Sequence, residues 1–174
     1  MKKTVGLFGI TANPPHYGHM EVIERASIDL DEVWVSPVFV HPFGKKFIDY
    51  SHRVNMLEML MKEITMKNVF LKHLDKEFFQ LKNEMVYSYL LLKYIKEQNP
   101  IVNFKLIVGE DNVKIFNKFK YGEEIINEFG LYTVKDEGFH STDIRNAIKE
   151  SREILGTSEQ VINYIKEYNL YKGD

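Results

Sequence analysis

The feature that most constrains this chain is a regular alternation of short apolar segments with segments of helical periodicity. Five segments rich in β-branched or aromatic residues are each long enough for one strand, and between them apolar residues recur every three or four positions. The predicted strands cover residues 4–10, 32–39, 68–73, 103–108 and 130–134. The predicted helices cover residues 17–30, 51–64, 84–97, 141–149 and 158–168, with one or two short helices within 111–128.

Strands that alternate with helices predict right-handed crossovers and a mostly parallel sheet. The predicted fold is therefore α/β: a Rossmann-like, doubly wound, mostly parallel five-stranded sheet with helices on both faces and further helices at the C-terminus. At 174 residues, without repeats or linker-like stretches, the chain is predicted to form a single domain over 1–174. Because ligands of such sheets bind at the carboxyl ends of the strands, we expect chemistry in the loops after residues 10, 39 and 109.

Composition argues against several classes of function. The chain has no cysteine, which excludes disulfides, thiolate nucleophiles and cysteine-ligated zinc or iron. Its 23 basic and 25 acidic side chains leave a formal charge of −2, so binding to a nucleic acid polymer is not expected. No apolar run approaches the roughly 18 residues of a membrane span, and the first residues lack the pattern of a signal peptide. We therefore expect a soluble, cytoplasmic protein that does not contact membranes.

The first candidate site is the run Asn-Pro-Pro-His-Tyr-Gly-His at residues 13–19, directly after the first predicted strand. Its two prolines end the strand and preset the turn into the next helix. His16 and His19 lie one turn apart at a helix N-terminus, where free N–H groups and the helix dipole attract anions and two imidazoles can donate to phosphate oxygens. The alternatives are ordinary capping histidines or a zinc pair, but a zinc site needs more ligands and His-Glu-x-x-His is absent.

The second candidate site is the run Phe-His-Ser-Thr-Asp-Ile-Arg at residues 139–145. Ser141 or Thr142 can N-cap the predicted helix, and Arg145 lies one turn further on. A capping hydroxyl, free N–H groups and a guanidinium together form a second phosphate-binding helix end. The alternative is a plain capped helix with a solvated arginine.

The third candidate is the loop His-Pro-Phe-Gly-Lys-Lys at residues 41–46, in which an ammonium group could meet phosphate charge. It is not a P-loop, because Phe39 stands where the first glycine is required and Lys46 stands where Ser or Thr should follow. The alternative is a solvated turn.

The fourth candidate is Val-Gly-Glu-Asp-Asn at residues 108–112, at the end of the fourth predicted strand. Gly109 permits a ligand to approach the backbone closely. Asp111 can accept hydrogen bonds from a ribose or a base edge, or simply cap the following helix.

Together these segments resemble the nicotinamide/nicotinate mononucleotide adenylyltransferase family of the HxGH nucleotidyltransferase superfamily. The resemblance covers nearly the whole chain, with the motifs in the expected order. Residues 6–19 resemble the family's opening motif, residues 109–112 its Gly-x-Asp motif, and Ser141-Thr142-x-x-Arg145 its late motif. Further similar segments are residues 36–38, 44–46 and 50–54 in the middle region and residues 161–171 in the closing helix.

The resemblance implies a nucleotidyltransferase of NAD biosynthesis. The 5′-phosphate of nicotinate or nicotinamide mononucleotide would attack the α-phosphorus of ATP in line, pyrophosphate would leave, and the dinucleotide would form. Catalysis would consist of positioning and charge stabilisation without a covalent enzyme intermediate. A Mg²⁺ cofactor would bridge the ATP phosphates, held mostly by water and substrate and by no metal ligands of the protein. The partners implied are ATP and a pyridine mononucleotide, and a homo-oligomer is compatible with the sequence.

The resemblance also implies roles for individual residues. His16 and His19 would hold the triphosphate and stabilise the reacting phosphoryl group. The implied catalytic residues are His16, His19, Lys46 and Arg145. The implied ATP-binding residues are Gly9, Ile10, Thr11, His16, His19, Lys45, Gly109, Asp111, Ser141, Thr142 and Arg145. The implied acceptor-binding residues are Thr11, Ala12, Asn13, Lys46 and Tyr87, with Lys45 and Lys46 as alternatives for the phosphate contact.

The chain departs from the family pattern at three places. Ile10 and Ala12 stand where a glycine and an aromatic residue are usual, and Phe119 lies near the position of a common tryptophan. These two departures bear on how the acceptor base is held. The third is His140, which stands where the late motif often has serine and could add a phosphate contact or face solvent.

Two other functions are compatible with the motifs. One is a related transferase such as phosphopantetheine adenylyltransferase, which usually has threonine where this chain has His16. The other is a nucleotide-binding sensor without turnover, against which the intact His16, His19 and Arg145 argue. Within the favoured family, the sequence leaves the choice between a nicotinate and a nicotinamide acceptor open.

Overall fold

The structure, a computed structural model, describes residues 2–42, 44–135 and 138–173, apart from the side chains of Asp111 and Asn117. The chain divides into two compact units. The first, here the sheet unit, comprises Met1–Ile10, Val22–Lys45 and Met66–Asp136; the second, here the helical unit, comprises Thr11–Glu21, Lys46–Thr65 and Glu137–Asp174. The single domain over 1–174 stays a prediction.

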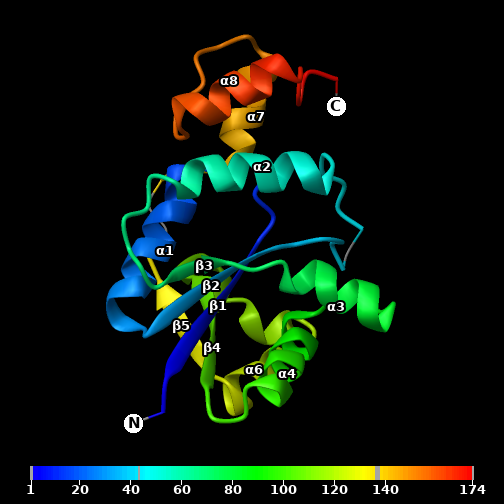
Figure 1. The fold of residues 1–174 in the computed structure, drawn as a ribbon. Helices are drawn as coiled ribbons and strands as arrows, with labels where there is room; N and C mark the ends of the chain where they lie inside the picture. The colour runs from blue at the N-terminus through cyan, green and yellow to red at the C-terminus, as the bar shows by residue number, and fades with distance from the viewer. Residues whose placement is uncertain (1, 43, 136–137, 174) are drawn as a thin grey trace. The chain divides into compact units, whose positions relative to one another are not determined.

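The sheet unit contains five parallel strands in the order β3-β2-β1-β4-β5 (Figure 1). The strands are β1 Thr4–Ile10, β2 Glu32–Pro37, β3 Val69–Leu71, β4 Asn103–Gly109 and β5 Leu131–Val134. This arrangement confirms the predicted α/β class and its parallel sheet. Three strands are shorter than predicted, β2 by two residues, β3 by three and β5 by one. β2 ends at Pro37, which has no N–H for the ladder, and β3 is an edge strand paired only with β2.

The order of the strands reverses between β1 and β4, which are direct neighbours (Figure 1). Their register pairs Leu7 with Leu106, so Ile10 at the end of β1 and Gly109 at the end of β4 belong to the same carboxyl edge. A ligand can approach a parallel sheet at this point because the crossover connections leave the edge in opposite directions. The ends of β1 and β4, at residues 10 and 109, therefore lie at the edge of the sheet where the sequence predicts a ligand site.

One face of the sheet is covered by α3 (Leu74–Lys82), α4 (Ser88–Gln98) and α6 (Gly122–Glu128). Alternate side chains of β1 and β4 point into this core. The core includes Val5, Leu7, Phe104, Leu106 and Val108 from the strands and Phe78, Leu91, Leu92, Ile95 and Ile125 from the helices. Where one or two short helices are predicted within 111–128, the structure has α5 (Glu110–Val113), the 3₁₀ turn η1 (Phe116–Lys118) and α6.

The region of α3 and α4 differs from the sequence prediction. No helix is predicted for residues 74–82, and the helix predicted from residue 84 begins at Ser88. α3 is only nine residues long and buries just Asp75 and Phe78, so it lacks a clear apolar stripe. It ends at Asn83, whose left-handed backbone (φ +50°) separates it from α4.

The opposite face of the sheet is packed by α1 (Tyr17–Asp29), whose first residues belong to the helical unit and whose later residues belong to the sheet unit. Gly6 of β1 allows this close packing. A Cβ at that position would lie 2.6 Å from Cδ1 of both Leu30 and Ile107, which is too close for a real contact.

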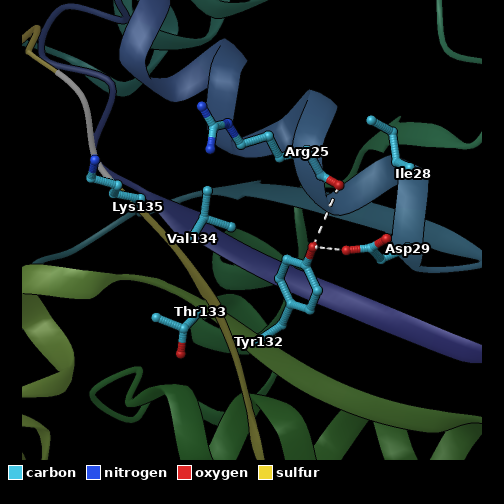
Figure 2. A pocket seen from close by; sticks show the side chains of 7 residues that line it. All are labelled: Arg25, Ile28, Asp29, Tyr132, Thr133, Val134 and Lys135. Atoms are coloured by element: carbon cyan, nitrogen blue, oxygen red, sulfur yellow. Dashed lines mark hydrogen bonds between the residues drawn. The ribbon is translucent and has the colours of Figure 1, made fainter.

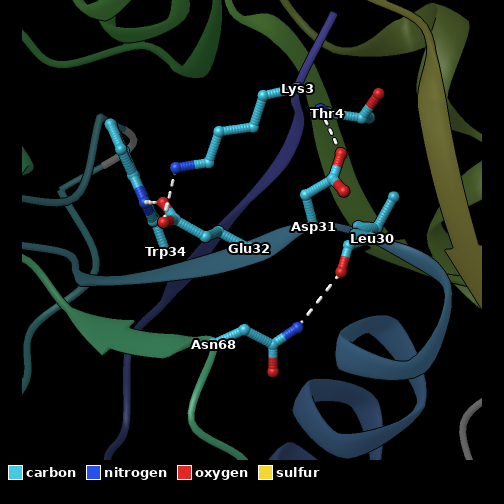
Figure 3. A network of polar contacts seen from close by, with 7 residues as sticks. All are labelled: Lys3, Thr4, Leu30, Asp31, Glu32, Trp34 and Asn68. Atoms are coloured by element: carbon cyan, nitrogen blue, oxygen red, sulfur yellow. Dashed lines mark hydrogen bonds and ion pairs between the residues drawn. The ribbon is translucent and has the colours of Figure 1, made fainter. Parts of the chain in front are cut away.

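A network of polar contacts joins the amino ends of β1 and β2, and we call it the amino-end network (Figure 3). Its contacts are Thr4 N to Asp31 Oδ2 at 2.7 Å, Lys3 Nζ to Glu32 Oε1 at 2.5 Å, Trp34 Nε1 to Glu32 Oε2 at 2.8 Å, and Asn68 Nδ2 to Leu30 O at 3.1 Å and to Ser27 O at 2.8 Å. These contacts tie the turn after α1 to two strands and to the start of β3.

The helical unit consists of α2 (Tyr50–Met61), α7 (Ser141–Lys149), α8 (Glu159–Glu167) and the first turn of α1. One cluster of buried side chains in this unit includes Met20 of α1, Met56 and Leu60 of α2, and Val161 and Ile165 of α8. Ile144 and Ala147 of α7 are buried as well. Ser158 caps α8 by accepting a hydrogen bond from the N–H of Val161 at 3.3 Å. Among the described residues, no helix combines the length and the apolar character needed to cross a membrane.

Candidate functional site

The loop after β1 turns sharply before it enters α1. Ala12 is 1% exposed and has φ +52°, a left-handed backbone that costs free energy in a residue with a Cβ. Such backbone strain persists only where the surroundings hold it, and it is frequent at binding sites. The small side chain of Ala12 fits this tight turn. The turn therefore forms here without the larger aromatic residue that the family usually has at this position.

Three consecutive carbonyl groups of this loop each accept a hydrogen bond from the C-terminal part of the chain. The three bonds run from Arg145 Nη1 to Asn13 O at 2.6 Å, from Ser141 Oγ to Pro14 O at 2.7 Å, and from Thr157 Oγ1 to Pro15 O at 2.9 Å. Two of the donors lie on α7 and the third lies just before α8. Side chains more than a hundred residues away in sequence therefore fix the loop that leads to His16.

His16 and His19 are brought together as the sequence predicts. Their rings stack with centroids 3.6 Å apart and an interplanar angle of 26°. The backbone N–H of His16 donates to Nδ1 of His19 at 3.2 Å. Because Nδ1 of His19 accepts this bond, a neutral His19 carries its proton on Nε2, where it can be donated to a ligand.

Two buried polar atoms at this pair have no hydrogen-bond partner among the residues that the structure describes: Nδ1 of His16 and Oδ1 of Asn13. Both residues are more than nine-tenths buried, with 7% and 8% of their surface exposed. Unpaired buried polar atoms cost free energy, and in native proteins they call for a ligand, a water or a functional role. They mark the place where this unit is built to receive another polar group.

The pKa of His16 is lowered to about 4, first by burial and then by the neighbouring His140, against an opposing effect of Asp143. Burial also lowers the pKa of His19 well below its usual value, with a second contribution from His16. Both rings are therefore neutral at pH 7 in the free protein. A phosphate group placed beside them would favour the charged form and raise both pKa values.

Gly18 is required by the same packing. A Cβ on Gly18 would lie 3.0 Å from Nδ1 of His16 and 3.2 Å from the carbonyl oxygen of Phe139. Any larger residue would push the His16 ring or the segment before α7 out of place. The glycine between the two histidines is thus explained by space rather than by backbone conformation.

The late motif lies in the same unit but does not cap its helix as predicted. The residue at the N-cap of α7 is His140, without a side-chain cap bond, and the hydroxyl of Ser141 donates to Pro14 O instead. The expectation that Ser141 or Thr142 caps α7 is therefore wrong, because the loop carbonyl offers Ser141 a partner. Oγ1 of Thr142 accepts a bond from Nη2 of Arg145 at 3.1 Å.

Two residues of the helical unit to which the sequence assigned no role support the loop. Arg53 is 1% exposed, donates to Thr11 O at 2.6 Å and to Ile48 O at 3.1 Å, and lies over the ring of Phe47 at 4.6 Å. Thr157 is the second. Arg53 lies in the family-like segment 50–54, but that segment indicated no contact with the loop. Thr157 belongs to no motif and carried no signal.

The remaining predicted residues have surface or edge positions. Lys45 belongs to the sheet unit and Lys46 to the helical unit, and both are exposed. Beside Lys45, the pKa of His41 is lowered first by burial and then by that lysine's charge. The exposed Gly9 and the buried Ile10 end β1.

Three further predicted residues, Gly109, Asp111 and Tyr87, belong to other parts of the sheet unit. Gly109 precedes α5, and the side chain of Asp111 lies outside the described part of the structure. The ring of Tyr87 meets Tyr121 edge to face with centroids 5.7 Å apart, and Nζ of Lys120 lies 4.2 Å from its centroid. Tyr87 is thus part of an aromatic and cationic cluster, and its role in acceptor binding stays a prediction.

An open pocket of about 320 Å³ lies elsewhere in the sheet unit, between α1 and β5 (Figure 2). Its lining contains none of the predicted site residues and consists of Arg25, Ile28, Asp29, Tyr132, Thr133, Val134 and Lys135. The hydroxyl of Tyr132 donates to Asp29 at 2.6 Å, and burial, followed by this bond, raises the pKa of Tyr132 to about 12. A hydrogen bond between two of the lining residues therefore joins the two walls of the pocket.

Comparison with known proteins supports the motif assignment. The cytidylyltransferase-like family model matches residues 7–167. A probable nicotinate-nucleotide adenylyltransferase of Christiangramia forsetii is 33% identical, over 99% of this chain and 100% of that protein. The nicotinate-nucleotide adenylyltransferase of Bacillus subtilis is 26% identical, over 98% and 99%. A Vibrio parahaemolyticus structure solved under the name of a nicotinate-nucleotide adenylyltransferase superposes with a TM-score of 0.84 at 29% identity, over 99% and 97%.

Proposed function

Since this chain belongs to the cytidylyltransferase-like family and, within it, to the nicotinate-nucleotide adenylyltransferases, we propose that it transfers the adenylyl group of ATP to a pyridine mononucleotide. The acceptor favoured by the names of its relatives is nicotinate mononucleotide. The products are pyrophosphate and a dinucleotide used for NAD synthesis. The activity belongs to a cytoplasmic enzyme, because ATP and pyridine mononucleotides are metabolites of that compartment.

The observation that carries this proposal is the stacked, neutral pair of His16 and His19 with an unpaired buried nitrogen beside it. In the reaction, an oxygen of the acceptor's 5′-phosphate forms a bond to the α-phosphorus of ATP. The bond from that phosphorus to the bridging oxygen of the β-phosphate breaks, and the electron pair leaves with pyrophosphate. Negative charge shifts onto oxygens around the α-phosphorus, where a preorganised N–H donor is worth about 3 kcal/mol.

His19 is suited to be that donor. Its Nδ1 is occupied by the N–H of His16, so Nε2 carries the proton that can be shared with a phosphate oxygen. In the free protein the two neutral imidazoles add no positive charge to that of Arg145, while the approach of a triphosphate raises the pKa of both rings. The site therefore gains positive character as the nucleotide arrives, and the proton is taken from solvent.

Arg145 would complete the charge balance on the β- and γ-phosphates. Its Nη1 and Nη2 are each engaged once, with Asn13 O and Thr142 Oγ1, and the guanidinium has five N–H donors in all. The residue can therefore hold the loop and still donate to phosphate. Ser141 and the exposed Thr142, Lys45 and Lys46 are the other proposed phosphate contacts.

We assign the adenosine side to Gly9, Ile10, Thr11, Gly109 and Asp111, and the acceptor side to Thr11, Ala12, Asn13, Lys46 and Tyr87, as the motifs imply. Mg²⁺ would arrive with ATP and neutralise its phosphates. We propose that this ion is held mainly by phosphate oxygens and water, as is usual for Mg²⁺ bound with a nucleotide. Both substrates are small molecules, and a homo-oligomer is compatible with this assignment.

The test is a pyrophosphate-release assay with ATP and Mg²⁺, run in parallel with nicotinate mononucleotide, nicotinamide mononucleotide and phosphopantetheine. We expect release with a pyridine mononucleotide, the dinucleotide as the second product by mass spectrometry, and a higher kcat/KM for the nicotinate form. Release with phosphopantetheine alone would overturn the proposed acceptor. ATP binding without release in any reaction would mean a nucleotide sensor and would overturn the enzyme assignment.

A further inference from the structure

Both peptide groups that flank His16 are held by residues 156 and 157. On the N-terminal side, the hydroxyl of Thr157 donates to Pro15 O at 2.9 Å. On the C-terminal side, the N–H of Tyr17 donates to Gly156 O at 2.8 Å. His16 is therefore fixed at both of its backbone connections by a single dipeptide from the end of the chain.

The Pro15–His16 peptide group takes part in a second hydrogen bond. Its carbonyl accepts the bond from Thr157, and its N–H, which belongs to His16, donates to Nδ1 of His19. A peptide group is planar, so fixing its carbonyl also fixes the direction of its N–H. The hydroxyl of Thr157 and the ring of His19 are thus connected through one rigid plane.

The surroundings of Thr157 make this connection specific. Thr157 is 6% exposed, and its bond to Pro15 is buried, so water does not replace it. Gly156 has φ +88°, and a Cβ there would lie 2.4 Å from the ring of Phe139. Only glycine at 156 allows the chain to place the next residue against the loop.

We propose that Thr157 is a positioning residue for adenylyl transfer, because its hydroxyl orients the Pro15–His16 peptide and thereby holds His19 with Nδ1 as acceptor and Nε2–H as donor. This proposal rests on the proposed function, but the tautomer of His19 can be measured without the reaction. In the alternative, Thr157 only stabilises the turn before α8, and its loss lowers stability without affecting the chemistry.

The matched variants are Thr157→Val, which keeps the shape and removes the hydroxyl, and Thr157→Ser, which keeps the hydroxyl. Thr65→Val, at an exposed position of the same unit, is the control. We expect Thr157→Val to lower kcat at least tenfold with the KM for ATP within threefold of the parent. Thr157→Ser and Thr65→Val should both stay within threefold. An equal loss in Thr157→Ser, or no loss in Thr157→Val, overturns the proposal.

A double-mutant cycle separates positioning from general damage. If Thr157 acts through His19, Thr157→Val in a His19→Ala background should lower kcat by less than twofold. A further tenfold loss in that background would show that the hydroxyl acts by another route and would overturn the connection through His19.

Long-range ¹H–¹⁵N correlation spectra of the histidine rings give the readout that needs no turnover. In the unaltered protein at pH 7, His19 should show an unprotonated Nδ1 and a protonated Nε2. Thr157→Val should convert this into a mixture of tautomers, and Thr157→Ser should not. A protonated Nδ1 in the unaltered protein overturns the proposal even if Thr157→Val fails to fold. If no acceptor is adenylylated, the proposed function fails while this measurement still tests the role of Thr157.

Discussion

Two polar clusters of this chain use hydrogen bonds in opposite ways. In the amino-end network, Asp31 accepts from Thr4 and Glu32 accepts from Lys3 and Trp34 (Figure 3). The polar groups of this network are therefore paired with one another. In the loop that leads to His16, the carbonyls of residues 13–15 are each paired, while two buried side-chain atoms have no partner among the described residues. The first arrangement joins strands. The second holds a backbone still so that side chains stay available.

The titration of the two clusters follows the same division. Burial alone would raise the pKa of Glu32, but the hydrogen bonds from Lys3 and Trp34 and the charges of Lys3 and Lys72 outweigh it, so the pKa is lowered and the charged form is favoured. Burial lowers the pKa of His16 to about 4 and favours the neutral form. Glu32 contributes to stability in its charged, paired form. His16 instead stays neutral in the free protein and can take up a proton when a negatively charged ligand binds.

The largest expected effect is on the site side of this comparison. His19→Ala should lower kcat by two or more orders of magnitude while leaving the fold intact, since a charge-stabilising donor is worth about 3 kcal/mol in a transition state. Steady-state kinetics and circular dichroism check this, with the exposed His73→Ala as the control. A near-normal kcat would remove the catalytic role of His19.

The second effect concerns stability against pH. The pKa of His16 is about 4 when folded and near 6.5 when unfolded, so between these values the unfolded chain binds more protons. The free energy of unfolding should therefore fall as the pH drops from 6.5 to 4, with about 2–3 kcal/mol of the loss due to His16. Urea titrations at both pH values should show a smaller loss in His16→Asn; an equal loss would mean that His16 is not buried in its neutral form.

A third, smaller effect tests whether the loop and the nucleotide share Arg145. Arg145→Ala should raise the KM for ATP about tenfold, because a hydrogen bond to a charged group contributes about 1.5–3 kcal/mol. Arg152→Ala, which removes an exposed arginine paired with Glu150, should leave the KM unchanged. If only the KM for the acceptor rose, the late motif would serve the acceptor instead of ATP.

The smallest effect lies in the amino-end network. Asn68→Ala removes the donor to Leu30 O and Ser27 O and should cost about 1–2 kcal/mol of stability in chemical denaturation. The kcat and both KM values should stay as they were, since this network belongs to no predicted site. A change in KM without a change in stability would erase the division between the two clusters.

The parts of the fold that sequence predicts are those with a strong local pattern. The apolar run at residues 4–10 predicts β1 with the bounds that the structure has. The turn after it predicts that His16 and His19 lie together, and their rings stack in the structure. α3 was missed because a nine-residue helix with two buried side chains has almost no periodic signal. Local pattern reports burial along one element, and α3 depends on tertiary packing instead.

The support of the site could not be predicted for a different reason. Motifs indicate side chains that contact ligands, whereas Thr157 and Arg53 hold backbone carbonyls of the loop, and any chain offers carbonyls. The prediction that Ser141 caps α7 is wrong for the same reason. Its hydroxyl donates to Pro14 O, a partner 127 residues away in the sequence, instead of capping the helix. Local pattern carries no information on such partners.

The three carbonyl bonds of the loop also set an order of events during synthesis. Residues 13–15 leave the ribosome early, and the last of their partners, Thr157, lies 142 residues behind Pro15. Chains fold from the N-terminus while they are made, so the central strands can pair before the loop is fixed. A nascent chain therefore acquires its sheet first and its histidine geometry last. Unfinished or C-terminally shortened chains would carry the whole motif and have no arrangement with which to use it.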